Sequence, residues 1–178
     1  MASKTAILIR EFLSSAEQKF AVVGASTNRS KFGNQVLRWY QENGYPAVVA
    51  VNPKETTIES APCVANLSSL PGKPSDYHVS VITPPAVTQS VLEEAHRNGI
   101  RRVWLQPGVE SPAALEYANS NGIQIIAEGP CVLVIAEDEA ECGTEIVVAG
   151  AVVLGRDGPA IDPPLPRLPE YRAIGVGF

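Results

Sequence analysis

The sequence predicts an α/β fold with a doubly wound, mostly parallel sheet and helices on both of its faces. Short apolar segments rich in valine alternate along the chain with segments of helical periodicity. The apolar segments are also continuous, without the polar–apolar alternation of a strand that has one face in solvent, which indicates strands buried on both faces. Because crossovers between parallel strands are right-handed, we expect a Rossmann-like sheet.

The first predicted elements are a helix, a strand and a second helix. Residues 5–13 form a short amphipathic helix that we expect to pack on the outside of the domain. Its apolar side chains are Ile7, Leu8, Phe12 and Leu13. The run KFAVVGAS is a buried strand that ends at Gly24, and a helix extends from Gly33 to Asn43. The predicted inner face of that helix carries Val36, Leu37 and Tyr40.

The next predicted strands are AVVAVNP, which stops at Pro53, and HVSVITPP, which stops at Pro84-Pro85. Between them, residues 62–70 fit a short edge element and a turn. The helix that follows Pro85 ends at Asn98-Gly99. Its predicted inward side chains are Val87, Val91, Leu92 and Ala95.

The last strands of the predicted sheet are RRVWLQPG and IQIIAEG. The helix between them begins with Ser111 as its N-cap and Pro112 at its first position, and it ends at Asn121-Gly122. After about residue 135 the pattern changes to an acidic run, an apolar run that fits a strand or a strand pair, and a proline-rich end. We therefore divide the chain into an N-terminal helix (1–19), the Rossmann-like domain (20–135) and a C-terminal extension (136–178).

Composition limits the classes of partner. The formal net charge of the 178 residues is -5, and this acidic balance argues against a nucleic-acid or membrane surface. The three cysteines are widely spaced and form no CxxC motif, which favours reduced thiols in a reducing compartment. We expect a cytoplasmic protein, with a mitochondrial location as the alternative.

Four strand ends carry the predicted site, because ligands of such sheets bind at the carboxyl ends of the strands. These ends read GASTNRSK, VNPKE, ITPPAV and LQPGV. The helix beginning near Gly33 points its N-terminus at this edge, where free N–H groups and the helix dipole favour an anion. The loop after Gly24 is not the GxGxxG motif, since Ala25 and Ser26 follow the glycine.

The end of the second strand distinguishes between nucleotides. NAD-binding folds usually place an acidic residue there, which accepts hydrogen bonds from the ribose hydroxyls. In this chain the basic residue Lys54 follows Pro53, and a cation at this position suits a phosphate on the ribose. NADP carries that phosphate at the 2′ position and coenzyme A (CoA) carries it at the 3′ position. Arg29 and Lys31 add charge beside the glycine loop.

Five motifs in order carry a family resemblance: VVGASTNRSKFGN, AVNPK, SVITPPAV, AHRNGIRRVWLQPGV and GIQIIAEGPCV. Over residues 20–134 the chain resembles the stand-alone CoA-binding proteins related to the N-terminal, Rossmann-like domain of the succinyl-CoA synthetase alpha subunit. In that family the glycine loop wraps the CoA phosphates, and the lysine after the second strand lies near the adenosine end. The resemblance implies a CoA or acyl-CoA site formed by Gly24, Ala25, Ser26, Arg29, Lys31, Asn52, Pro53, Lys54, Thr83, Pro84, Gln106 and Gly108.

The sequence offers no evident catalytic set beside this site. His78 enters a strand and His96 lies on a helix flank, so we interpret both as structural or exposed, and we interpret Glu128 as a solvated loop carboxylate. The leading hypothesis is a small CoA-binding protein without chemistry of its own. The alternatives are an NADP-dependent reductase and a nucleotide-binding subunit that acts only with a partner. The apolar run 146–154 would suit an interface with such a partner or with a second copy.

Overall fold

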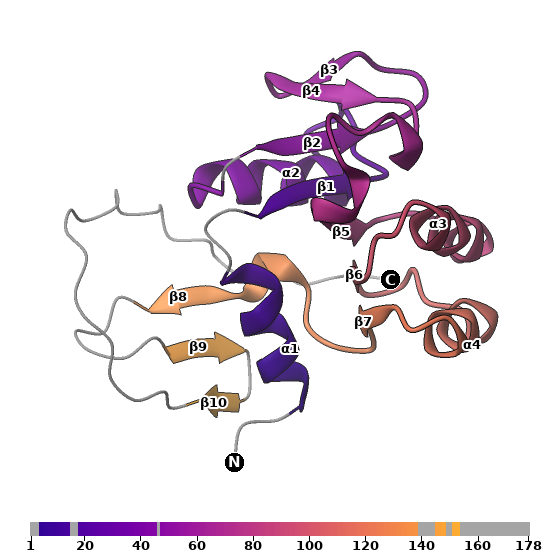
Figure 1. Ribbon diagram of the computed structural model, residues 1–178. Coiled ribbons are helices and arrows are strands. Elements are labelled where there is room, and N and C mark those ends of the chain that lie inside the picture. Colours follow the sequence, from indigo (N-terminus) through magenta and orange to yellow (C-terminus); the bar gives the residue numbers. More distant parts are fainter. Residues whose placement is uncertain (1–3, 15–17, 46, 139–144, 149–150, 154–178) are drawn as a thin grey trace.

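A computed structural model describes residues 4–14, 18–45, 47–138, 145–148 and 151–153 (Figure 1). Its main sheet has seven strands in the order β3-β4-β2-β1-β5-β6-β7. All neighbouring strands of this sheet are parallel except the β3–β4 pair. The predicted doubly wound, mostly parallel sheet is therefore confirmed. The strands are β1 (Lys19–Val23), β2 (Val48–Val51), β3 (Thr57–Ile58), β4 (Ala61–Val64), β5 (Tyr77–Val81), β6 (Arg102–Leu105) and β7 (Gln124–Ile126).

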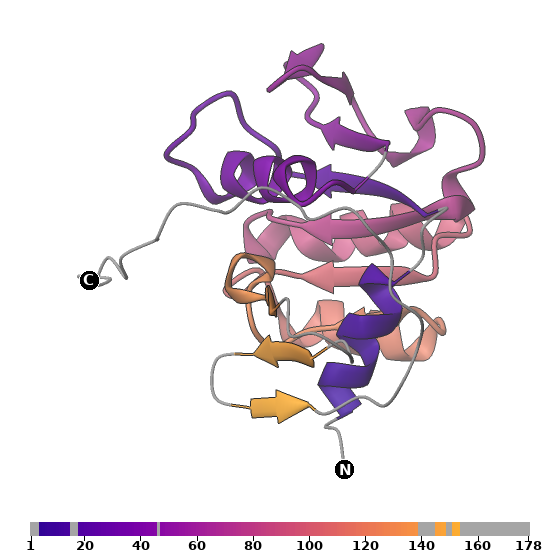
Figure 2. The same cartoon turned by 90° about the vertical axis from the view of Figure 1, so that its left-hand side faces the viewer.

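Helices cover both faces of the main sheet, as predicted (Figure 2). On one face, α1 (Lys4–Leu13) and α2 (Phe32–Glu42) share a core with Phe20 of β1 and Trp104 of β6. On the other face, α3 (Pro85–Arg97) and α4 (Pro112–Ser120) pack on the valines of β1, β2 and β5. Because successive strand residues point to opposite faces, a strand that is buried throughout contributes side chains to the cores on both faces.

The inner face of α3 corrects one prediction. Val87 is 44% exposed, although it was expected to point inward, and Ile7, one of the apolar residues of the predicted first helix, is 39% exposed. In α1 the buried residues recur as Ala6, Ile9, Phe12 and Leu13, and in α3 as Thr88, Val91, Leu92 and Ala95. Each set follows the helical period, and Ile7 and Val87 fall one position outside it. The inward positions of Val36, Leu37 and Tyr40 in α2 are confirmed.

Two connections in the first half of the sheet contain no α-helix. Between β2 and β4 the chain forms the two-residue strand β3 and turns back at Glu59 and Ser60, both of which have positive φ angles. Between β4 and β5 it forms two short 3₁₀ segments, Leu67–Ser69 and Pro74–Asp76. The short element and turn predicted for residues 62–70 correspond to β4 and the first of these segments, but β3 and not β4 lies at the edge of the sheet, because β3 pairs with the outer side of β4.

The chain beyond the main sheet forms a second, antiparallel sheet of three strands in the order β10-β9-β8. These strands are β8 (Ala136–Asp138), β9 (Glu145–Val148) and β10 (Ala151–Val153). The apolar run after residue 145 is thus a strand pair, one of the two readings that the sequence allowed. The proline-rich end and Cys142 lie outside the described residues. None of the described helices combines the length and the apolar character needed to cross a membrane.

His78 joins α1 to the sheet from the middle of the core. Its Nδ1–H donates to the backbone oxygen of Phe12 at 2.7 Å, and its Nε2 accepts from Nη1 of Arg102 at 3.3 Å. The ring also lies 4.9 Å from the Phe12 ring. Burial lowers the pKa of His78 to about 4, because the charged imidazolium would lose its hydration there. The expectation that His78 has a structural role therefore has a geometric basis: it is a neutral anchor for α1.

Candidate functional site

The carboxyl ends of the central strands meet at one edge of the sheet, as the site prediction requires. Three backbone hydrogen bonds continue the ladder one step beyond the paired residues: Gly24 N to Val51 O at 3.1 Å, Ile82 N to Val23 O at 2.8 Å and Gln106 N to Val81 O at 3.1 Å. Strand order reverses between β1 and β5, because the chain first builds toward β4 and then toward β7 (Figure 1). Ligands of open α/β sheets bind at such a switch point.

Two glycines hold the loop after β1 close to its neighbours. Gly24 has a φ of +86°, and a Cβ at this residue would lie 2.1 Å from the backbone oxygen of Ile82. A Cβ on Gly33 would lie 2.1 Å from the oxygen of Gly24. Any side chain at either position would therefore clash with backbone atoms. The two glycines bring the first turn of α2 directly against the end of β1.

Two asparagine amides brace the loop from opposite sides. Asn52, at the end of β2, donates from Nδ2 to the oxygen of Ala25 at 2.8 Å, and its Oδ1 accepts from the N–H of Lys54 at 2.8 Å. Asn34, which is fully buried in α2, donates to the oxygen of Ser26 at 2.8 Å. The amide of Asn52 is thus engaged by the protein itself, and it fixes both the glycine loop and the turn that carries Lys54.

The loop presents backbone donors at the N-terminus of α2. Within the described residues, the N–H groups of Ala25, Ser26 and Thr27 donate to no protein atom, and neither do those of Phe32 and Gly33. The first N–H groups of a helix have no partner inside the helix and carry the positive end of its dipole. The loop and the start of α2 together can therefore bind an anion.

Three cations surround this loop, and they differ in their surroundings. Lys31 and Lys54 are exposed, and neither forms an ion pair within the part of the chain that the structure describes. Arg29 does form one: its Nε lies 3.3 Å from Oε1 of Glu59, in the β3–β4 turn. The structure therefore leaves the charges of Lys31 and Lys54 unneutralised and compensates the charge of Arg29.

The remaining predicted residues come from the ends of β5 and β6. Thr83 follows β5, and its hydroxyl lies 3.0 Å from the buried hydroxyl of Thr88 in α3. Pro84 is exposed and caps α3 at the same edge. Gly108 has a φ of +89°, and its N–H donates to a carboxylate oxygen of Glu110 at 2.8 Å. That carboxylate also accepts from the N–H of Glu128 at 3.2 Å, so it joins the loops after β6 and β7.

Gln106 is a buried residue with an unused donor. The residue is 4% exposed, and its Oε1 accepts a hydrogen bond from the N–H of Val132 at 2.9 Å. Its Nε2 has no hydrogen-bond partner within the described residues. A buried donor without a partner costs roughly 1–3 kcal/mol, so this amide is an energetically unfavourable group beside the predicted site.

The structure thus gathers all twelve predicted residues on four neighbouring strand ends and the loops that follow them. It also adds three residues that sequence reasoning missed, namely Asn34, Glu59 and Glu110. Asn34 carried a signal, because it is a polar residue one helical turn before the inward Leu37. Glu59 and Glu110 carried none, since each acts through loops that only the fold brings together.

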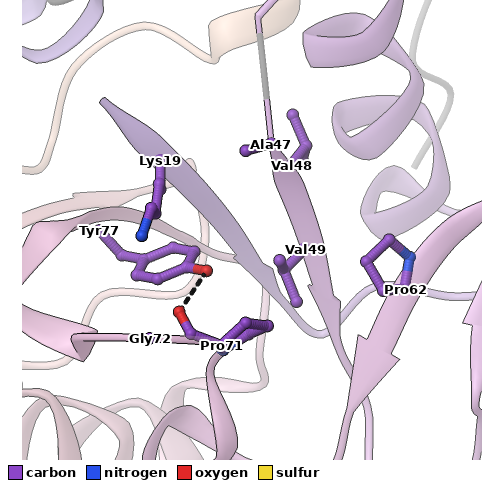
Figure 3. A pocket seen from close by; sticks show the side chains of 8 residues that line it. All are labelled: Lys19, Ala47, Val48, Val49, Pro62, Pro71, Gly72 and Tyr77. Atoms are coloured by element: carbon purple, nitrogen blue, oxygen red, sulfur yellow. Dashed lines mark hydrogen bonds between the residues drawn. The ribbon is translucent and has the colours of Figure 1, made fainter. Parts of the chain in front are cut away.

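A cavity at the opposite end of the strands is separate from this site (Figure 3). Lys19, Val48 and Tyr77 of its lining are the first residues of β1, β2 and β5, and its volume is about 370 Å³. Apart from Lys19 and the hydroxyl of Tyr77, its lining is apolar. That hydroxyl donates a hydrogen bond to the backbone oxygen of Pro71 at 3.0 Å. We therefore place the candidate site at the carboxyl edge, where the glycine loop, the free N–H groups and the cations converge.

Metal ligands do not gather in the described residues, which contain no group of three or more histidine, cysteine, aspartate or glutamate side chains able to hold a metal ion. The thiols of Cys63 and Cys131 are half-buried, and burial raises the pKa of each. A raised pKa disfavours the reactive thiolate. The free N–H groups of the loop and the exposed lysines make the binding of an anionic group the chemistry that the candidate site supports best.

Known structures with the same fold include small proteins of similar length. A hypothetical protein from Pyrococcus horikoshii is 28% identical, with a TM-score of 0.64 and coverage of 73% of this chain and 87% of that chain. A protein from Thermus thermophilus is 30% identical, with a TM-score of 0.61 and coverage of 71% and 92%. An acetyl-coenzyme A synthetase from Ca. Korarchaeum cryptofilum is 25% identical, with a TM-score of 0.57, and the match covers 69% of this chain but 27% of the synthetase.

No functionally curated protein matches this chain at a significant level. The family model described as a CoA binding domain does match, and it spans residues 18–137. That span contains the whole main sheet and every residue of the predicted site. The resemblance seen in the sequence motifs is thereby confirmed, and the chain belongs to the CoA-binding domain family.

Proposed function

We propose that this protein binds CoA or an acyl-CoA at the carboxyl edge of the main sheet. The observation that carries the proposal is the glycine loop, in which Gly24 and Gly33 hold unpaired N–H groups against the start of α2. A diphosphate is the ligand group that suits such a loop, because small residues let the backbone approach it closely. Membership of the CoA-binding family supports CoA as the molecule that carries this diphosphate.

The rest of the ligand follows from the order of the strands. The adenosine end lies toward β2, where Lys54 meets the 3′-phosphate, and Lys31 adds charge at the rim of the loop. The pantetheine arm extends the other way, over Pro84 and toward Gln106. The unpaired Nε2 of Gln106 supports this direction, because an amide carbonyl of pantetheine would satisfy it once a movement of the loop after β6 exposes the buried amide.

The charge of Lys54 provides the test of this arrangement. We expect Lys54→Ala to weaken CoA binding by about threefold to thirtyfold, since a hydrogen bond to a charged group is worth roughly 1.5–3 kcal/mol before screening at an exposed site. Dephospho-CoA lacks the 3′-phosphate, so its affinity should change much less. Isothermal titration calorimetry with both ligands measures the two effects.

Lys73→Ala is the matched control for this measurement, because Lys73 is also exposed but precedes β5 at the opposite end of the strands. It should leave both affinities unchanged. If Lys54→Ala weakens the binding of CoA and of dephospho-CoA equally, Lys54 does not contact the 3′-phosphate. Binding of NADPH in place of CoA would assign the lysine to a 2′-phosphate and replace the proposal with the reductase alternative.

We further propose that the protein binds its ligand without transforming it. His78 is a buried structural anchor in the core, and His96 lies on the flank of α3. Glu128 is exposed in the loop after β7. The purified protein should therefore neither hydrolyse acetyl-CoA, assayed by thiol release, nor oxidise NADPH, assayed by absorbance. A turnover that survives purification and is lost in Lys54→Ala would contradict this expectation and indicate an enzyme.

A further inference from the structure

The carboxylate of Glu59 is bound to the glycine loop from the neighbouring β3–β4 turn. One oxygen, Oε1, accepts from Nδ2 of Asn34 at 3.0 Å and lies 3.3 Å from Nε of Arg29. Asn34 holds the loop through the oxygen of Ser26, and Arg29 belongs to the loop itself. A negative charge from another part of the chain is therefore already present beside the first turn of α2.

The backbone of Glu59 is held in an unfavourable conformation at this position. Glu59 and Ser60 have φ angles of 47° and 63°, so a two-residue turn with left-handed backbone at both positions carries neither glycine nor asparagine. This conformation costs roughly 1 kcal/mol or more per residue that has a side chain. The turn is also tied to α2, because Nε2 of Gln41 donates to the oxygen of Glu59 at 3.0 Å. The fold thus keeps this carboxylate at the loop in spite of local strain.

The ion pair changes what Arg29 can contribute to ligand binding. Its side chain is 66% exposed and that of Glu59 is 23% exposed, so the pair lies at the rim of the loop, where a ligand phosphate can approach it. The carboxylate offsets part of the attraction of Arg29 for a second anion, although the ion pair engages Nε and not the two Nη groups. A phosphate that binds the loop therefore gains less from Arg29 than it would from an unpaired arginine, and it gains the full charge only if Arg29 turns away from Glu59.

We propose that Glu59 is an internal counter-ion of the binding loop, which competes with the phosphates of the ligand for Arg29 and thereby lowers the affinity of the site. Arg29 turns from Glu59 to a phosphate when the ligand binds, and Arg29 pairs with Glu59 again when the ligand is released. This inference rests on the proposed binding of a phosphate-containing ligand at the loop. It assigns to Glu59 the role of an affinity-determining residue that makes no favourable contact with the ligand.

Glu59→Gln tests the proposal, since the glutamine keeps an acceptor for Asn34 and removes only the charge. Glu116→Gln is the control: it removes the same charge from an exposed position of α4, on the other face of the main sheet from α2. We measure the affinity of both variants for CoA and for inorganic pyrophosphate by calorimetry, in low and in high salt. We expect Glu59→Gln to bind both probes about twofold to fivefold more tightly in low salt, because an exposed ion pair is worth up to roughly 1 kcal/mol.

The gain should shrink in high salt, and Glu116→Gln should show none. Unchanged or weaker binding by Glu59→Gln, with a melting temperature close to that of the unmodified protein, would overturn the proposal, and weaker binding would identify Glu59 as a support of the loop. If the unmodified protein binds pyrophosphate but not CoA, the proposed function fails, and the pyrophosphate series alone decides the role of Glu59. Failure of the unmodified protein and of Glu59→Gln to bind either probe would overturn both.

Discussion

Gly33→Ala is expected to destabilise the protein by about 3 kcal/mol or more, although the same change in most helices is stabilising. Gly33 has an ordinary helical backbone, so alanine would normally gain about 1 kcal/mol there. The new Cβ would instead lie 2.1 Å from the oxygen of Gly24 and 3.2 Å from Cα of Ala25, and neither is the end of a flexible side chain. The first turn of α2 must then move away from the end of β1.

Thermal unfolding and CoA titration measure the two consequences of this change. The melting temperature should fall by roughly 6–12 °C for a chain of this size, and CoA affinity should fall because the loop N–H groups lose their arrangement. Gly44→Ala is the comparison: its φ of +73° costs about 1 kcal/mol, but no atom lies within 4 Å of the added Cβ. A Gly33→Ala protein as stable as the unmodified one would show that α2 does not pack so closely on β1.

The free energy of unfolding should fall by up to about 3 kcal/mol between pH 6.5 and pH 4 because of His78. The pKa of His78 is lowered from 6.5 to about 4 in the folded protein by burial. In this interval the unfolded chain binds a proton that the folded chain does not, so stability decreases as the pH falls. The loss is complete below the folded pKa, and above pH 6.5 the residue has no further effect.

His78→Asn isolates this contribution. The Nδ2 of asparagine occupies a place similar to that of Nδ1 and can still donate to the oxygen of Phe12, while the titrating ring is removed. Urea unfolding at a series of pH values gives the difference between the two proteins, in which the titrations of the carboxylates cancel. We expect this difference to change between pH 6.5 and pH 4 only. Parallel pH profiles would show that His78 is protonated in the fold without cost.

The sequence was sufficient to predict the strands and helices of the main sheet, because nearly all of them depend on local patterns. Valine-rich runs that end at glycine or proline form β1, β2 and β5. The predicted N-cap Ser111 accepts a hydrogen bond from the N–H of Ala114 at 3.2 Å. The error at Val87 is of a different kind. This residue is apolar and lies beside the inner face of α3, and only the exact rotation of the helix leaves it in solvent.

The part of the site that escaped prediction depends on contacts between distant segments. The hydrogen bond between Asn34 and Glu59 joins residues that are 25 positions apart, and it exists because β3 folds back beside α2. Local patterns predicted this region only in part, as a short edge element and a turn at residues 62–70. The ion pair of Arg29 was missed for the same reason, since a cation beside a glycine loop suggests a ligand until its internal partner is seen.

The pairing of β1 with β5 has a consequence for the order of folding. Phe20 pairs with Val48 on one side and with His78 on the other, so the second partner is 58 positions away in the chain and the first only 28. Bringing distant segments together costs more chain entropy, and non-local parallel pairing is slow. The pairing of β1 with β5, beside which the ligand is proposed to bind, is therefore expected to form late in folding. A ligand held across it would retard unfolding more than it accelerates folding.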